Sequence, residues 1–208
     1  MLTDDHTVRT TLVSGDPELC KAFLFEAAIY WAKQGLQVYC IAPKQFEYLP
    51  PIFHGRSEPS ANTLRLISFI YPSDYDELLS LLVRLPTFAR IASVVLLDEF
   101  DTYCSSRDAK SWAQLCAALL NAAEQCSSDR RPVRICATTT GLDQKQEARG
   151  WSHCLKMYFD EKWNLQMESD DACDTEDIRK VSLKNVDRGS IELCWLNDGA
   201  LVLRKIFA

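Results

Sequence analysis

Gly15 and Lys21 lie where the sequence changes from a strand-like to a helix-like pattern. In a phosphate-binding loop of the form G-x-x-x-x-G-K-[ST], glycines let backbone N–H groups surround the phosphates, the lysine neutralises them and the hydroxyl binds magnesium. This chain keeps the first glycine and the lysine, but Cys20 replaces the second glycine and Ala22 replaces the hydroxyl residue. The alternative interpretation is an ordinary strand-to-helix turn in which Asp16 caps the helix.

A second candidate for nucleotide chemistry is the segment 94–99, VVLLDE, in which Asp98 and Glu99 follow four apolar residues. Open α/β sheets bind ligands beyond the carboxyl ends of their strands. In P-loop enzymes a carboxylate at such a position helps to hold magnesium. Many buried strands end in Asp, but the two motifs in this order favour P-loop ancestry. The candidate nucleotide-binding residues are Gly15, Lys21, Asp98 and Glu99.

The elements that must position these residues alternate between strand and helix. Apolar runs predict strands at 8–14, 36–42, 63–71, 93–100 and 133–139, and apolar residues at helical spacing predict helices at 18–34, 73–85 and 112–123. The middle helix has a capping box, Ser73-x-x-Asp76, and Pro86 stops it. This alternation predicts a mainly parallel central sheet with helices on both faces.

The pattern after Gly141 is different, because short two-sided strands replace the alternation. Strands are predicted at 154–159, 162–168, 178–185, 190–196 and 200–207, the last two joined by Asn197-Asp198-Gly199 as a hairpin turn. We therefore expect one α/β domain over residues 1–208. It would consist of a P-loop core in 1–140 and a C-terminal antiparallel β extension in 141–208.

Composition limits the classes of function that the chain could have. A formal net charge of -6 gives no global basic field for nucleic acid, so any such contact needs a local patch. The nine cysteines include no CxxC pair and fall mostly in apolar segments, so we expect reduced core thiols and no zinc site. The first residues, MLTDDH, are too acidic for a signal peptide, and no apolar run has the length of a membrane span. These features predict a protein of the cytosol or nucleus without membrane contact.

The order of these motifs resembles the recombinase paralogues of the RecA superfamily, and most closely the RecA-like subunits of metazoan Shu complexes. The stretch from Leu64 to Tyr103 carries most of the resemblance, with Arg65-Leu66, Tyr71-Pro72 and Leu97-Asp98 as landmarks. The resemblance implies a RecA-like fold, a location in the nucleus and a SWIM-type zinc-finger protein as partner. It also implies a role in helping a strand-exchange recombinase to assemble on single-stranded DNA during homologous recombination.

Two further positions depart from the active members of that superfamily. In RecA-type ATPases the strand after the first helix ends in a catalytic glutamate, whereas the matching stretch here is 41–45, IAPKQ, with Lys44 near that position. The strand that usually ends in a phosphate-sensing glutamine ends here in Thr138-Thr139-Thr140. We therefore expect no catalytic residues, no required cofactor and at most weak binding of ATP. An active ATPase completed by a partner, and a protein-only scaffold, are the alternatives.

The resemblance also points to two loops that face DNA in RecA-like proteins. Here they fall in 105–112 and 141–153, where cations and aromatic residues are interleaved. Charge neutralisation combined with base stacking suits a single strand. The candidate DNA-binding residues are Arg107, Lys110, Lys145, Arg149 and Trp151. The alternative is that Trp112 belongs to the helix core and that the cations are ordinary solvated charges.

Overall fold

Nine strands form one sheet in the order β3-β2-β4-β5-β1-β6-β7-β8-β9 within the described part of the chain. The computed structural model describes residues 8–46, 58–104, 109–128, 131–140, 155, 157–167, 178–185, 189–196 and 201–207. The strands are β1 (Val8–Gly15), β2 (Val38–Ile41), β3 (Ile67–Ile70), β4 (Val94–Leu97), β5 (Val133–Thr139), β6 (Glu161–Met167), β7 (Ile178–Asn185), β8 (Gly189–Leu196) and β9 (Leu201–Phe207).

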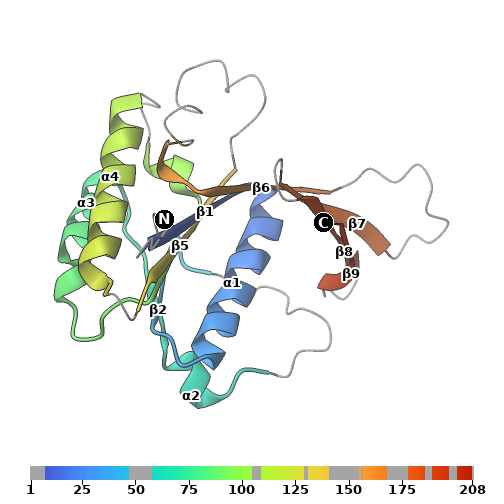
Figure 1. The fold of residues 1–208 in the computed structure, drawn as a ribbon, viewed down its shortest axis with the longest axis horizontal. Helices are drawn as coiled ribbons and strands as arrows, with labels where there is room; N and C mark the ends of the chain where they lie inside the picture. Colours follow the sequence, from blue (N-terminus) through green and yellow to red (C-terminus); the bar gives the residue numbers. More distant parts are fainter. Residues whose placement is uncertain are drawn as a thin grey trace, which may run out of the picture.

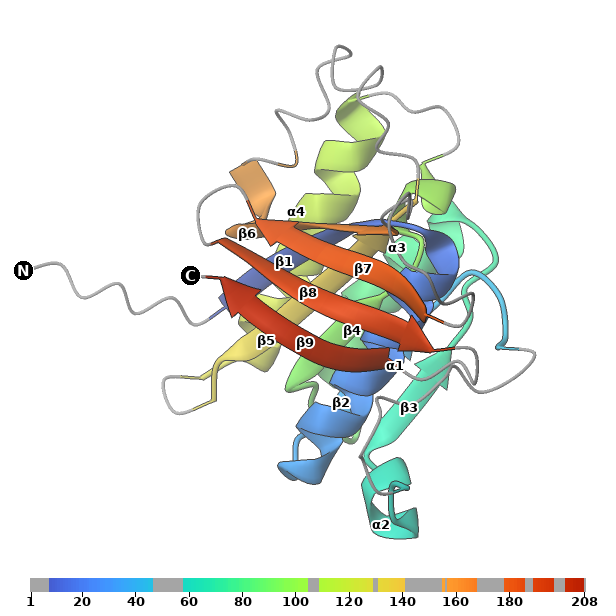
Figure 2. The ribbon, with the colours of Figure 1, turned by 90° about the vertical axis from the view of Figure 1, so that its right-hand side faces the viewer.

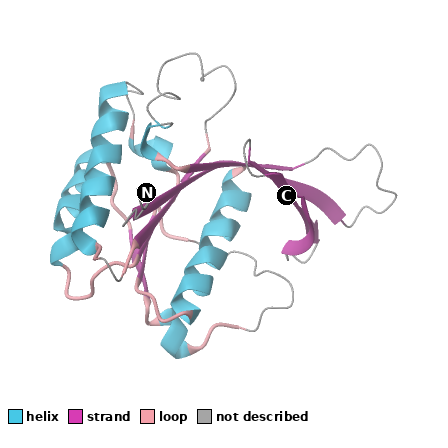
Figure 3. Cartoon of the chain, in the orientation of Figure 1, coloured by secondary structure: helices cyan, strands magenta, loops and turns pink. Residues whose placement is uncertain are grey.

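Helices cover both faces of the parallel part of the sheet, as Figures 1 and 3 show. They are α1 (Pro17–Lys33), α2 (Ala61–Leu64), α3 (Tyr75–Arg84) and α4 (Ala109–Cys126), with short 3-10 turns η1 (Leu85–Thr87) and η2 (Phe100–Tyr103). Helix α1 lies on one face, and α3 and α4 lie on the other. Every residue of β2 and of β4 is buried, which explains their continuous apolar sequences.

The core is divided between the two faces of the sheet. The larger cluster joins α3, α4 and η2 to the sheet, and Trp112 packs edge-on against Phe100 there, with ring centroids 5.0 Å apart. On the other face, Phe25, Ala28 and Ile29 of α1 pack against β2 and β4. Trp112 is therefore a core residue, 1% exposed, and not a candidate for stacking on bases.

The C-terminal extension begins with a parallel strand. Strand β6 pairs in parallel with β1, and only β7, β8 and β9 continue the sheet in antiparallel fashion (Figure 2). The α/β fold with a mainly parallel sheet and an antiparallel extension is thus confirmed, with β6 as a sixth parallel strand. The predicted turn Asn197-Asp198-Gly199 lies outside the described residues.

Three predicted elements differ from the structure. Thr63 and Leu64 belong to helix α2 and not to the following strand. Leu155, Met157 and Tyr158 are helical, and the Phe159 N–H bonds the Leu155 carbonyl at 3.1 Å, so the strand predicted at 154–159 is wrong. Helix α3 is capped one residue later than expected, because the Asp74 side chain accepts from the Glu77 N–H.

Candidate functional site

The candidate nucleotide site begins where β1 meets α1, and only Asp16 separates the two elements. Helix α1 starts at Pro17, and Asp16 is its N-cap. The Oδ1 atom of Asp16 accepts hydrogen bonds from the N–H groups of Glu18 (3.0 Å) and Leu19 (3.2 Å). The alternative interpretation of this stretch, a turn capped by Asp16, therefore describes its geometry.

Gly15 lies at the end of β1, opposite Leu165 of β6. A Cβ atom added to Gly15 would lie 2.9 Å from the Leu165 carbonyl carbon and nearer still to its oxygen. Real Cβ atoms essentially never come that close to backbone. The glycine is thus required by the close approach of β6. The sequence could not reveal this requirement, because Leu165 is distant along the chain.

Lys21 projects from the second turn of α1 and forms ion pairs with two carboxylates. Its Nζ atom lies 3.4 Å from Glu18 Oε1 and 3.4 Å from Glu99 Oε1. Partial burial acts to lower the pKa of Lys21, but the neighbouring carboxylates of Glu99 and Glu18 raise it above its ordinary value. Lys21 is therefore a stable cation whose charge is already balanced by the protein. The ion pair with Glu99 joins α1 to the end of β4.

Asp98 follows β4 and is 3% exposed. Its Oδ1 atom accepts a hydrogen bond of 2.7 Å from the Thr138 hydroxyl, whose oxygen in turn accepts from the Glu99 N–H at 3.0 Å. The Oδ2 atom has no hydrogen-bond partner within the described residues. Burial raises the pKa of Asp98 to about 6, while the bond from Thr138 opposes that rise. Sequence reasoning treated Thr138 only as a substitute for a sensor residue and missed its bond to Asp98.

The backbone at Glu99 is left-handed, with a φ angle of 45°. Non-glycine residues adopt this conformation rarely, and such positions cluster at functional or formerly functional sites. The conformation brings the Glu99 carboxylate to Lys21 and its N–H to Thr138. Lys21, Asp98 and Glu99 are thus brought together at the carboxyl edge of the sheet, as the motifs predicted.

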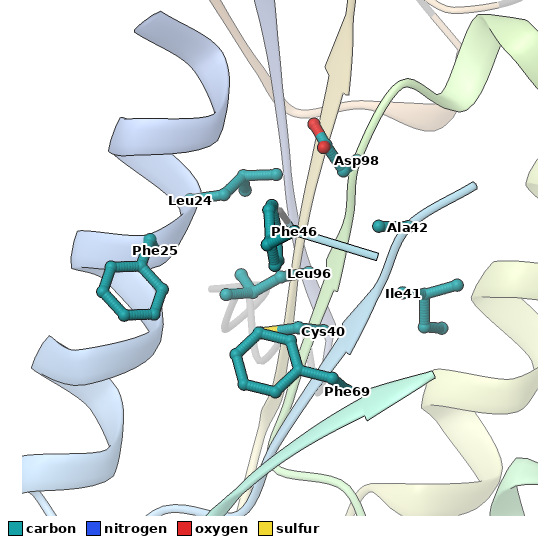
Figure 4. Close-up of a pocket in the computed structure, with 9 residues that line it drawn as sticks. All are labelled: Leu24, Phe25, Cys40, Ile41, Ala42, Phe46, Phe69, Leu96 and Asp98. Atoms are coloured by element: carbon teal, nitrogen blue, oxygen red, sulfur yellow. The ribbon is translucent and has the colours of Figure 1, made fainter. Parts of the chain in front are cut away.

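Residues 42–46, the described part of the stretch after β2, contain no carboxylate. Lys44 and Gln45 are exposed, and Phe46 turns back into a small apolar pocket between α1 and the strands. Figure 4 shows Phe46 and Phe69 in this pocket, with Asp98 at its far end. The cavity that remains has a volume of about 10 Å³, enough for one water molecule at most. No signal in the sequence had singled out Phe46.

The candidate DNA-binding residues are mostly beyond the structural description. Lys110 is exposed in the first turn of α4, at the same edge of the sheet as Asp98. Arg107, Lys145, Arg149 and Trp151 lie outside the described residues. Thr140, which precedes the second loop, is held by Asp101, since its N–H lies 3.2 Å from Asp101 Oδ1.

Metal clusters, membrane-spanning helices and reactive thiols are the other kinds of functional feature considered for the described residues. Within the described ranges, no group of three or more His, Cys, Asp or Glu side chains is placed to hold a metal ion. None of the helices described is both long enough and apolar enough to cross a membrane. The free thiols include Cys20, Cys40, Cys104, Cys116, Cys126 and Cys136. Burial raises the pKa of Cys136 to about 12, so that this thiol is unreactive.

Comparisons with known proteins identify the fold. No protein-family model matches the sequence, and neither does any curated protein. Among solved structures, one ATPase domain matches with a TM-score of 0.60 and 12% identity, over 97% of this chain and 86% of that one. A DnaB-like replicative helicase, solved to show its interactions with primase, matches with a TM-score of 0.57 and 14% identity, over 93% of this chain and 57% of that one.

These identities are low, so the likeness concerns the fold. The chain has the α/β fold of RecA-like ATPase domains, with a mainly parallel sheet and antiparallel strands at its C-terminal end. The side chains at the junction of β1 and α1 add to this description. Lys21 and Glu99 form an ion pair beside the N-terminus of α1, which Asp16 caps.

Proposed function

We propose that this chain is a recombination mediator, with no ATPase activity of its own or only a weak one, that acts in the nucleus. The observation that supports this most directly is the β1–α1 junction, where the Asp16 carboxylate accepts the hydrogen bonds of the first helical turn. A RecA-like fold that lacks a phosphate loop still offers a rigid surface to other macromolecules. Such a role is the one implied by the resemblance to the recombinase paralogues.

The proposed protein partners are a SWIM-type zinc-finger protein and the strand-exchange recombinase whose assembly it supports. The resemblance over Leu64–Tyr103 is the basis for both partners. The sheet itself favours association, since its outer strands β3 and β9 have no further strand beside them in the described part of the chain. Edges of this kind can accept a strand from another chain.

The proposed nucleic-acid partner is single-stranded DNA, bound by Arg107, Lys110, Lys145, Arg149 and Trp151. The net charge of -6 means that binding must come from such a local set. Lys110 supports the idea, because it is exposed at the carboxyl edge of the sheet. ATP is not required in this proposal.

The experiment is a titration of single-stranded oligonucleotides with the complex of this chain and its zinc-finger partner, at several salt concentrations. Lys145→Glu combined with Arg149→Glu should weaken binding and flatten its salt dependence, because each lost phosphate contact reduces the slope. Lys110→Glu should act in the same direction. The matched control is Arg65→Glu, an exposed cation that precedes β3 at the opposite edge of the sheet. Equal affinities in the double variant and the control would contradict the DNA assignment.

An active ATPase is the second candidate function, because Lys21, Asp98 and Glu99 do meet at one edge of the sheet. In that case a partner chain would have to supply the missing groups. Phosphate release by the complex distinguishes this candidate from the mediator. A complex that assists the recombinase without binding DNA would instead indicate a protein-only scaffold.

A further inference from the structure

Every backbone hydrogen-bond donor in the first turn of α1 already has an acceptor within the chain. Pro17 has no N–H, the N–H groups of Glu18 and Leu19 bond Asp16 Oδ1, and the Cys20 N–H bonds the Asp16 carbonyl at 2.9 Å. A helix N-terminus binds phosphate through these same donors. Here a carboxylate from the chain itself occupies the position of the anion, so the donors are not available to a nucleotide.

The packing around this turn also prevents a loop from opening. The position that corresponds to the second loop glycine is Cys20, which is 0% exposed, and Ala22 is buried to the same extent. Both side chains pack with Leu165 and Val181 of the C-terminal strands. A loop wide enough for phosphates would have to remove them from this cluster and separate Gly15 from Leu165. The loss of packing would destabilise the C-terminal strands as well as α1.

The positive charge of Lys21 is already neutralised without a ligand, and the site carries an excess of carboxylates. Lys21 lies between the carboxylates of Glu18 and Glu99, and Asp16 adds a third carboxylate at the start of the same helix. A triphosphate would have to compete with these carboxylates for one ammonium group. Its own negative charge would also be repelled by them.

The same contacts join three elements that a bound nucleotide would otherwise connect. The Lys21–Glu99 ion pair links α1 to the end of β4, and the Thr138–Asp98 hydrogen bond links β4 to β5. Thr140, just beyond β5, bonds Asp101 of η2. The carboxyl edge of the sheet is thus held together by contacts within the chain.

We infer that this chain is independent of nucleotide: it binds neither ATP nor ADP, and its own side chains fix the edge of the sheet that a nucleotide fixes in active members of the fold. The inference deepens the proposed function and rests on its non-catalytic part. The ATP that the fold would suggest as a ligand does not fit the residues present.

The test is thermal unfolding of the full chain, with and without millimolar magnesium and ATP or ADP, together with filter retention of labelled ATP. An active RecA-type ATPase serves as positive control. We expect the same Tm with and without nucleotide and no retained label. A magnesium-dependent rise in Tm that is lost in Lys21→Ala would overturn the inference.

Two further variants test the same inference. Asp16→Asn keeps an oxygen that can cap the helix but removes the negative charge, and it should still show no response to nucleotide. A gain of ATP binding in this variant would mean that the charge of Asp16 alone excludes the ligand, which would contradict the argument from packing. Lys21→Met should lower the Tm by the same amount with and without ATP, since it breaks only ion pairs within the chain. A difference between the Tm shifts measured with and without ATP would count against the inference.

The outcomes also separate this inference from the proposed function. Binding of ATP without turnover would overturn nucleotide independence and leave the non-catalytic mediator standing. Absence of ATP binding, together with a complex that fails to assist the recombinase, would support nucleotide independence and contradict the mediator role.

Discussion

Asp98 follows β4 at the carboxyl edge of the sheet, in a buried environment. The residue is 3% exposed, and one of its oxygens is engaged by the Thr138 hydroxyl at 2.7 Å. Burial favours the neutral acid, which raises its pKa to about 6. A carboxyl group that is enclosed in this way binds a hydrated divalent cation less readily than an exposed carboxylate.

The raised pKa of Asp98 predicts a pH dependence of stability. The folded state binds the proton more tightly than the unfolded state, in which the pKa is near 3.8. Lowering the pH through about 6 should therefore stabilise the folded wild type relative to Asp98→Asn, which cannot titrate at this position. Between about pH 8 and about pH 5 the difference should change by about 1 kcal/mol.

The measurement is denaturant unfolding of both proteins across this pH range. The remaining carboxylates are common to both, so their contributions cancel in the comparison. A stability difference that stays constant, or that moves in favour of Asp98→Asn as the pH falls, would contradict the account of Asp98.

At the scale of elements, the early start of α1 and the added strand β6 belong together. Strand β6 runs beside β1 as far as Gly15, and its Leu165 packs with Cys20 and Ala22 of α1. A start of α1 further along the chain would remove Cys20 and Ala22 from this cluster, because both lie in its first turns. The loss of the phosphate loop is thus a property of packing between elements as well as of single substitutions.

Gly15→Ala tests this relation, since its Cβ would collide with the Leu165 backbone. We expect a loss of about 1–3 kcal/mol in the free energy of unfolding, as for other overpacked positions. The matched control is Gly35→Ala, where a positive φ of 79° is strained for alanine but no atom lies within 4 Å. That variant should lose about 1 kcal/mol. Chemical denaturation that shows no greater loss at Gly15 than at Gly35 would contradict the packing argument.

The sequence predicts those elements whose pattern is local. Continuous apolar runs identified β2 and β4, and helical spacing identified α3 and α4. The error at 154–159 arose because a short apolar segment does not distinguish strand from helix. In the structure Leu155 and Phe159 are both buried, at a spacing that suits a helical turn.

The site was predictable only in part, for a related reason. The approach of Lys21 to the residues after β4 follows from the motif order, and the structure shows the ion pair with Glu99. The parallel pairing of β6 with β1 and the insertion of Phe46 depend on contacts between distant parts of the chain. No pattern in the sequence records such contacts, so the choice between a phosphate loop and a capped turn remained open until the structure.

The molecule as a whole combines a RecA-like sheet with a carboxyl edge closed by internal contacts. Its mainly parallel sheet is covered by α1 on one face and by α3 and α4 on the other. At its carboxyl edge, the Lys21–Glu99 ion pair and the Thr138–Asp98 hydrogen bond connect α1, β4 and β5. With a net charge of -6, the proposed contact with DNA would depend on a local set of cations.

ATP turnover is the measurement that tests the non-catalytic account most directly. Phosphate release should be measured for the purified chain and for a mixture with the proposed zinc-finger partner, with and without single-stranded DNA. The values should be compared with those of Lys21→Ala and Asp98→Ala. We expect release at background in every case, because loss of a general base alone reduces rates by about 10²–10⁴-fold and the magnesium hydroxyl is also absent. Magnesium-dependent turnover above background that disappears in both variants would contradict the account.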